Sequence, residues 1–161
     1  MHTRAAHLID ALGLVPHPEG GYFREVYRSA SRVQPLDDRP ERAALTTIYF
    51  LLASGTVSRW HRVLSDEAWH HYEGDPLELW VADTAFNQVT RHLLGPVGDR
   101  MRPTCVVRAD EGQAARSTGG YTLVGCTVGP GFEFADFRLI DARSERAMTI
   151  RERFPHAAEF L

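Results

Sequence analysis

The chain has 161 residues, of which 43% are hydrophobic and 24% charged, and its formal net charge is −3. This length and composition predict one soluble globular domain over residues 1–161 and exclude a disordered or fibrous protein. The charge balance leaves no electrostatic footprint for nucleic acid or for an anionic membrane surface, so neither is expected as a partner.

The sequence also gives no sign of membrane insertion or of a disulfide framework. No stretch approaches the roughly 20 consecutive apolar residues that cross a bilayer, and the first residues lack the apolar core of a signal peptide. Cys105 and Cys126 have no metal-finger spacing. We therefore expect two buried, reduced thiols in a cytoplasmic protein.

The first elements predicted are a helix and a turn. Residues 3–12 carry a stripe of apolar side chains typical of a short helix, with Thr3 as its cap and Gly13 at its end. The segment 16–21 that follows is dense in proline and glycine and predicts a turn.

From residue 22 onward nearly every segment predicts a short strand. Alternation places Phe23 and Tyr27 on the face opposite Arg24 and Arg28. The strands are expected at 22–29, 44–53, 57–63, 67–73, 77–83, 87–94, 104–109, 121–128 and 132–139. About nine short strands with few helices imply an all-β sandwich or barrel.

Two segments lie outside this strand pattern. Residues 31–42 predict a polar loop, in which Arg39 and Arg42, on either side of Glu41, are expected on a solvated surface. Residues 144–161 are ambiguous and are compatible with a short helix broken by Pro155.

One histidine and one glutamate carry the chemistry predicted from the strands. His61 lies on the strand 57–63, and the tight turn 64–66 returns the chain so that Glu67 faces the histidine from the neighbouring strand. An imidazole and a carboxylate placed this way inside a barrel can bind a metal or form a proton-transfer pair.

These residues resemble the first motif of the cupin superfamily. Gly55, His61, Glu67 and Gly74 fall on the spacing of that motif, while Val63 stands where cupins have a second histidine. In the second motif, Gln113 stands where a third metal-binding histidine is found.

More specifically, the chain resembles the cupin subfamily known as Cupin_5, or DUF985. The blocks that carry the resemblance, in chain order, are 16–25, 48–52, 61–70, 125–132 and 136–137. The resemblance implies an all-β cupin double-stranded β-helix, a jelly-roll-like barrel with a short N-terminal helix. It also implies a small-molecule pocket and a homodimer.

The missing histidines leave the question of a metal open. A divalent transition metal is possible, with His61, Glu67 and Gln113 as ligands and either His70 or His71 as a further one. Strand parity places His71 on the face of Glu67, whereas the family resemblance favours His70. Because a valine contributes nothing and an amide is a poor ligand for such ions, we expect no cofactor.

Several further residues are candidates for ligand binding or proton transfer. Tyr22 and Arg24 follow the glycine turn, and Arg24 could clamp an anionic group of a ligand. Tyr49 is a candidate general acid. Trp69 and Phe132 could provide a stacking surface inside the barrel.

Three functions remain open at this point. The first is a metal-independent isomerase or epimerase that acts on a sugar nucleotide or another small carbonyl compound, with His61 as the base and Glu67 as its partner. The second is a metal-dependent oxygenase or lyase, and the third is a non-catalytic binding protein or sensor.

Overall fold

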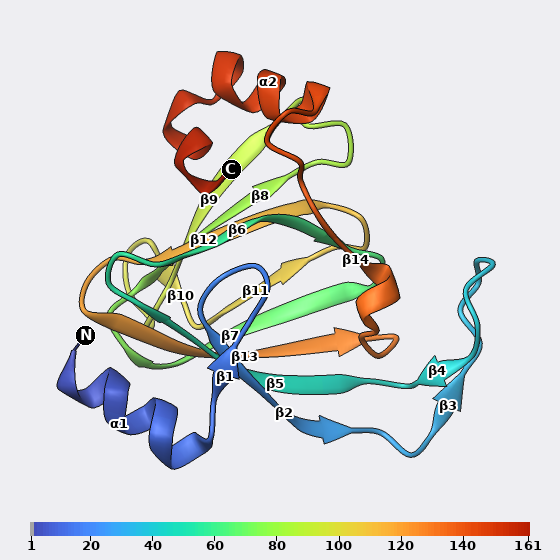
Figure 1. Ribbon diagram of the computed structural model, residues 1–161, viewed down its shortest axis with the longest axis horizontal. Helices are drawn as coiled ribbons and strands as arrows, with labels where there is room; N and C mark the ends of the chain where they lie inside the picture. Colours follow the sequence, from blue (N-terminus) through green and yellow to red (C-terminus); the bar gives the residue numbers. More distant parts are fainter. Residues whose placement is uncertain (1) are drawn as a thin grey trace.

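Two facing β-sheets form the body of the protein in the computed structural model, which describes residues 2–161 (Figure 1). The first sheet has the strand order β1-β2-β5-β13-β7-β11. Its strands are β1 (Val15–Pro16), β2 (Tyr22–Arg28), β5 (Thr46–Ala53), β7 (Asp66–Gly74), β11 (Thr104–Val107) and β13 (Tyr121–Gly129).

The second sheet has the order β10-β9-β8-β12-β6-β14. Its strands are β6 (Val57–Val63), β8 (Leu77–Ala82), β9 (Val89–Leu94), β10 (Met101–Arg102), β12 (Gly112–Ser117) and β14 (Phe137–Leu139). Consecutive strands repeatedly change sheet, as β5 to β6 and β6 to β7 do, so the two sheets close around a shared interior. The prediction of an all-β barrel or sandwich is confirmed.

Most expected strands are present, with one that differs and one that is additional. The segment 132–139 is not one strand, because the 3₁₀ turn η1 (Phe134–Asp136) precedes the short β14. The strand β12 was not expected. It lies between β6 and β8 as a central strand, and its small, buried alanines allow the neighbouring strands to pack closely.

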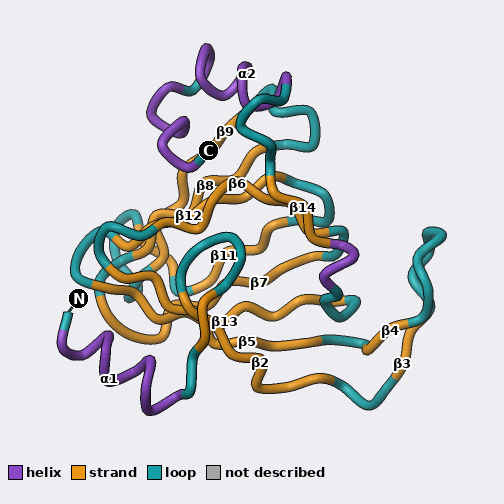
Figure 2. The backbone as a smooth tube through the Cα atoms, in the orientation of Figure 1, coloured by secondary structure: helices purple, strands orange, loops and turns teal. Residues whose placement is uncertain are grey.

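Helices cover the outer faces of both sheets (Figures 1 and 2). The helix α1 (Thr3–Leu12) packs Ala5 and Leu8 against the first sheet and ends at Gly13, whose φ of 60° suits glycine. Its cap is the ring of His2, which accepts from the backbone N–H of Arg4, rather than Thr3.

The C-terminal segment forms a second cover. The helix α2 (Glu145–Arg153) and the 3₁₀ segment η2 (Pro155–Phe160) bury Ile150 and Phe160 against the second sheet. The predicted break at Pro155 is therefore present. No helix within residues 2–161 is long and apolar enough to cross a membrane.

A hairpin arm extends from the first sheet beside η1 (Figures 1 and 2). It contains β3 (Arg32–Val33) and β4 (Arg42–Ala43), which pair antiparallel. Arg42 of this arm is buried and forms an ion pair with the buried carboxylate of Asp136 in η1. The predicted position of Arg42 on a solvated surface is wrong, because Asp136, distant in sequence, supplies its partner.

Candidate functional site

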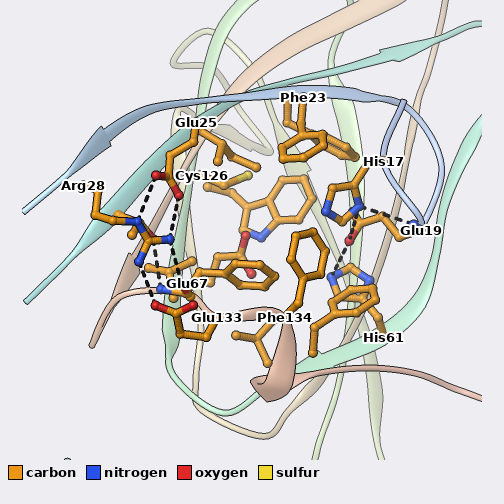
Figure 3. A pocket seen from close by; sticks show the side chains of 18 residues that line it. His17, Glu19, Phe23, Glu25, Arg28, His61, Glu67, Cys126, Glu133 and Phe134 are labelled. Carbon is orange, nitrogen blue, oxygen red and sulfur yellow. Dashed lines mark hydrogen bonds and ion pairs between the residues drawn. The ribbon is translucent and has the colours of Figure 1, made fainter. Parts of the chain in front are cut away.

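A pocket opens between the two sheets at the end where β2, β5 and β6 meet the loop before β14 (Figure 3). It encloses about 90 Å³. Its lining combines six aromatic side chains, two histidines, four glutamates and one arginine with smaller residues, counted over residues 2–161. The lining residues are His17, Glu19, Phe23, Glu25, Arg28, Thr46, Ile48, Phe50, His61, Val63, Glu67, Trp69, Cys126, Val128, Phe132, Glu133, Phe134 and Phe137.

The turn between β1 and β2 carries Glu19 into this pocket. The backbone N–H of Gly20 donates to the carbonyl of His17, and the carbonyl of Glu19 accepts from Arg59 of β6. Gly20 has a φ of +115°, and a Cβ there would lie 2.0 Å from the carbonyl oxygen of Val57. Only glycine allows the turn to approach β6 this closely, so the glycine turn is what buries Glu19.

His61 pairs with Glu19 rather than with Glu67. Its Nε2 lies 3.2 Å from Oε2 of Glu19, and its Nδ1 lies 2.8 Å from the carbonyl oxygen of Arg59. Because a carbonyl oxygen only accepts, Nδ1 carries a ring proton. Burial lowers the pKa of His61, so the ring is neutral and Nε2 presents a lone pair to the carboxyl group. The expected orientation of His61 by Glu67 is replaced by orientation from Arg59 and Glu19.

The surroundings of Glu19 favour its protonated form. Its Oε2 also lies 3.4 Å from Nδ1 of His17, a nitrogen that accepts from the backbone N–H of Glu19. The lone pair of His61 Nε2 faces the same oxygen, and this contact attracts only if the oxygen carries hydrogen. The other oxygen, Oε1, accepts from the hydroxyl of Ser58 at 2.7 Å.

Burial shifts the pKa values of this cluster toward neutral forms. Desolvation raises the pKa of Glu19 to about 8, although the Ser58 hydrogen bond and nearby Arg59 lower it. Desolvation, with a smaller contribution from His61, lowers the pKa of His17 to about 4, and burial also lowers the pKa of His61. At neutral pH the cluster therefore contains one protonated acid between two unprotonated imidazoles.

Glu67 lies on another wall of the pocket and is held by a relay of hydrogen bonds. The indole Nε1 of Trp69 donates to Oε1 of Gln113 at 3.0 Å, and Nε2 of Gln113 donates to Oε2 of Glu67 at 2.6 Å. Since indole N–H is a donor only, Trp69 fixes the orientation of the amide. Burial raises the pKa of Glu67, whereas His61 and the Gln113 donor act against that rise.

Five of the residues predicted for the site lie in the pocket or directly behind its wall. His61, Glu67, Trp69 and Phe132 line the pocket. Gln113 lies directly behind Glu67 as its hydrogen-bond partner.

Tyr22, Arg24 and Tyr49 point away from the pocket, contrary to prediction. On β2 and β5 their neighbours Phe23 and Phe50 face inward, and strand alternation turns Tyr22, Arg24 and Tyr49 to the outer face. There Tyr22 and Tyr49 pack beside α1, and Arg24 donates to the carbonyl of Leu12 at 3.0 Å. Arg24 thus satisfies a carbonyl at the end of α1 instead of clamping a ligand.

Neither His70 nor His71 lines the pocket. Pairing between β7 and β13 is regular from Glu67 to His71, so His70 faces outward and approaches the hydroxyl of Thr104 at 3.3 Å. His71 has the inward parity of Glu67 but lies four residues farther along the strand, about 13 Å at the usual strand rise. Its Nε2 lies 3.3 Å from the carbonyl oxygen of Asp75.

The residues present do not match the metal site that a full cupin motif implies. The oxygen of Gln113 is occupied by Trp69, so the amide turns its N–H₂ group toward Glu67. Val63 takes the place of one histidine. Within residues 2–161 no group of three or more histidine, cysteine, aspartate or glutamate side chains is arranged to hold a metal ion.

Sequence reasoning missed five lining residues of the N-terminal part: His17, Glu19, Phe23, Glu25 and Arg28. The available signal is the segment 16–25, which carries the family resemblance but predicts only a turn followed by Tyr22 and Arg24 as ligand-binding residues. Arg28 reaches the pocket because a β-bulge between Glu25 and Tyr27 reverses the alternation of β2.

Arg28 closes one side of the pocket with two ion pairs (Figure 3). Its guanidinium contacts Glu25 at 2.9 Å and Glu133 at 2.8 Å, and it also donates to the carbonyl of Phe132. These contacts connect β2 to the loop before η1. His17, Glu19 and His61 lie on the opposite side of the pocket.

The protonated state of Glu19 predicts a fall in stability between pH 6.5 and pH 8. In this range the folded state, with a Glu19 pKa of about 8, retains a proton that an unfolded glutamate of pKa 4.5 has lost. Stability therefore decreases as pH rises. His17, at about 4 when folded and 6.5 when unfolded, is neutral in both states over most of this range.

Urea unfolding midpoints at the two pH values measure this effect, with Glu19→Gln as the comparison. Between the two pH values, the variant should lose less stability than the wild type. A smaller decrease should remain, because the raised pKa of Glu67 also makes the folded state less stable as pH rises. An equal fall in both proteins would contradict a protonated Glu19.

Solved structures of whole relatives share this fold. A hypothetical protein from Leishmania major is 33% identical, with a TM-score of 0.82, over 96% of this chain and 94% of its own. A protein from Shewanella oneidensis is 31% identical, with a TM-score of 0.80, over 96% and 92%. A cupin-2 domain protein from Rhodospirillum rubrum, 12% identical with a TM-score of 0.60 over 91% and 85%, shares the fold alone.

No curated protein matches this chain. The family described as Cupin_5, Cupin superfamily (DUF985), matches residues 6–140. This range includes β1 to β14 and every lining residue of the pocket. The chain therefore belongs to the Cupin_5 (DUF985) family of the cupin superfamily.

Proposed function

We propose that this cupin is an isomerase that moves protons between carbon and oxygen of a small carbonyl compound without a metal. The observation that carries the proposal is the position of Glu19 Oε2 between two imidazole nitrogens, Nε2 of His61 at 3.2 Å and Nδ1 of His17 at 3.4 Å, in the same pocket as Glu67. The pocket thus combines a buried acid that holds a proton with a second carboxyl group in a different environment.

We assign the two carboxyl groups opposite roles from the groups beside them. Glu67 accepts from the N–H of Gln113, and such a donor favours the carboxylate. Glu19 also accepts from a donor, the Ser58 hydroxyl, but its other oxygen lies beside the lone pair of His61, and such an acceptor favours the protonated acid. Burial raises the pKa of both groups, and that of Glu19 reaches about 8, so Glu19 is assigned as the acid and Glu67 as the base.

In the proposed step, Glu67 takes the proton from the carbon next to the carbonyl group, and Glu19 gives its proton to the carbonyl oxygen. If the carbon next to the carbonyl group carries a hydroxyl, the product is an enediol, with Glu67 now protonated and Glu19 ionised. Glu67 then returns its proton to the former carbonyl carbon, and Glu19 recovers a proton from the hydroxyl of the neighbouring carbon, whose oxygen becomes the new carbonyl. His61 is a positioning residue, since its Nε2 holds the Glu19 proton in place.

The size and charge of the pocket favour a small carbonyl compound over a sugar nucleotide. A volume of about 90 Å³ is well below the roughly 300–1,000 Å³ of pockets that enclose drug-sized ligands. The guanidinium of Arg28, which could meet a phosphate, already contacts Glu25 and Glu133.

Proton exchange with solvent tests the proposal. Small aldehydes and hydroxyketones are incubated with the full-length protein in D₂O, and loss of the α-proton is followed by NMR. We expect exchange with one class of compound, at the same rate after treatment with a chelator. Tyr49→Phe should exchange at the wild-type rate, because Tyr49 lies on the outer face.

Two results would contradict the proposal. Exchange that stops with the chelator and returns with a divalent metal would indicate a metal-dependent cupin. Compounds that raise the melting temperature without any exchange would indicate a binding protein.

A further inference from the structure

The pocket contains more acidic groups than basic ones. Among its lining residues in the described range 2–161, four glutamates face a single arginine. Arg28 contacts both Glu25 and Glu133, so this side of the pocket retains one negative charge. Glu67 adds a buried carboxyl group that the Gln113 donor favours in its charged form.

Aromatic rings surround the space between these acids. Phe23 meets the ring of His17 edge-on, with 4.6 Å between ring centroids, and Phe134 stacks on the same ring with 6.0 Å between centroids. The ring centroids of Phe132 and Phe134 lie 5.1 Å apart. Phe137 completes the group, with its centroid 5.3 Å from that of the His61 ring. Figure 3 shows Phe23 and Phe134 between the Arg28 side and the His17 side of the pocket.

Rings and carboxylates together favour a positive charge. The face of an aromatic ring is negative and attracts an ammonium group within about 6 Å. A carboxylate strengthens this attraction, and the effect is largest where water is excluded. An anionic ligand would instead meet Glu67 and find Arg28 already paired.

We propose that the substrate of this site carries a small positively charged group, such as an ammonium, held among the phenylalanine rings and facing the glutamates. The inference rests on the proposed function, for which it names the substrate class: amino aldehydes, amino ketones or their alkylated forms. The ammonium group occupies the ring-lined part of the pocket, and the carbonyl group lies toward Glu19 and Glu67.

A matched pair of probes tests the charge preference. Choline and 3,3-dimethylbutan-1-ol have the same shape, but the alcohol has a neutral carbon in place of the charged nitrogen. Calorimetry on the full-length protein should show choline binding at least about tenfold more tightly than the alcohol, the size of effect that cation–π attraction supports. Acetate should give no detectable binding.

Variants locate the effect in the pocket. Glu67→Gln should weaken choline binding several-fold and leave the binding of the alcohol unchanged. Glu73→Gln, the same change on the same strand β7 but paired with Arg4 outside the pocket, should alter neither. Equal binding of choline and the alcohol, no binding of choline, or tighter binding of acetate would overturn the inference.

The binding result separates this inference from the proposed function. Preference for choline without proton exchange in any carbonyl compound would remove the isomerase and retain the charge preference of the pocket. Exchange confined to neutral or anionic carbonyl compounds would retain the isomerase and remove the charge preference.

Discussion

Glu67→Gln should reduce the rate of α-proton exchange by about 10²–10⁴-fold, the usual loss when a general base is removed. The amide has nearly the shape of the carboxylate, and its oxygen can still accept from Nε2 of Gln113. It cannot take a proton from carbon at neutral pH. The exchange rates of the variant and the wild type are measured by NMR in D₂O, with a carbonyl compound whose α-proton the wild type exchanges.

The fold should survive this substitution, because it removes a desolvated carboxyl group rather than a packing partner. Glu67 is 7% exposed, and burial raises its pKa, so its charged form is costly in the folded state. Glu73→Gln, on the same strand but ion-paired with Arg4 at the surface, serves as the control and should exchange at the wild-type rate. A Glu67→Gln protein that is folded and still exchanges at that rate would remove Glu67 from the mechanism.

Strand periodicity was sufficient to predict the part of the pocket formed by regular strands. His61 of β6 and Glu67 of β7 were expected to face one cavity, and both line it. This succeeded because the bulge of β6 lies before His61, alternation is regular from His61 to Val63 and from Glu67 to Trp69, and the turn 64–66 is short. For the choice between His70 and His71, which the sequence left open, the structure has His70 facing outward, as strand parity alone would place it.

The residues that determine the chemistry of His61 were not accessible to this reasoning. Glu19 lies in a turn, where side-chain direction depends on the φ of glycines and on contacts with a distant strand. Gly20 fits against Val57, thirty-seven positions later, and no periodic pattern encodes that contact. A motif that names only His61 and Glu67 therefore suggests a pair between them, whereas the turn supplies Glu19 as the nearer partner.

A shift of one residue explains the errors on β2. The sequence block 22–25 was correctly associated with the site, but Tyr22 and Arg24 were chosen where Phe23 and Glu25 face inward. Polar side chains are the usual ligand-binding residues, but the sequence alone does not show which face of β2 meets the interior of the barrel. The bulge after Glu25 then brought Arg28 inward, and bulges leave little signal in a single sequence.

A buried carboxylate connects the hairpin arm to the wall of the pocket. Asp136 in η1 forms ion pairs with Arg42 and with Arg39 of the arm, the latter at 3.2 Å. Its neighbours Phe134 and Phe137 line the pocket. The position of this wall thus depends on a contact between segments about a hundred residues apart, which neither segment reveals alone.

Asp136→Ala should lower the free energy of unfolding by about 3–5 kcal/mol, because it leaves the guanidinium of Arg42 buried without a carboxylate. Arg42 is 2% exposed, and its remaining side-chain partner is the carbonyl of Pro40 at 3.1 Å. Asp136→Asn keeps the shape and an acceptor oxygen, so it should lose less. Urea unfolding of the three proteins measures these differences.

Asp37→Ala is the matched control, since it removes the exposed carboxylate that Arg39 contacts at 2.9 Å. Exposed ion pairs contribute about 0–1 kcal/mol, so this variant should unfold close to the wild type. If Asp136→Ala proved as mild as Asp37→Ala, the burial of Arg42 would not depend on Asp136. A large loss from Asp136→Ala, with Asp37→Ala unchanged, would instead identify this ion pair as the contact that holds η1, and with it Phe134 and Phe137, against the arm.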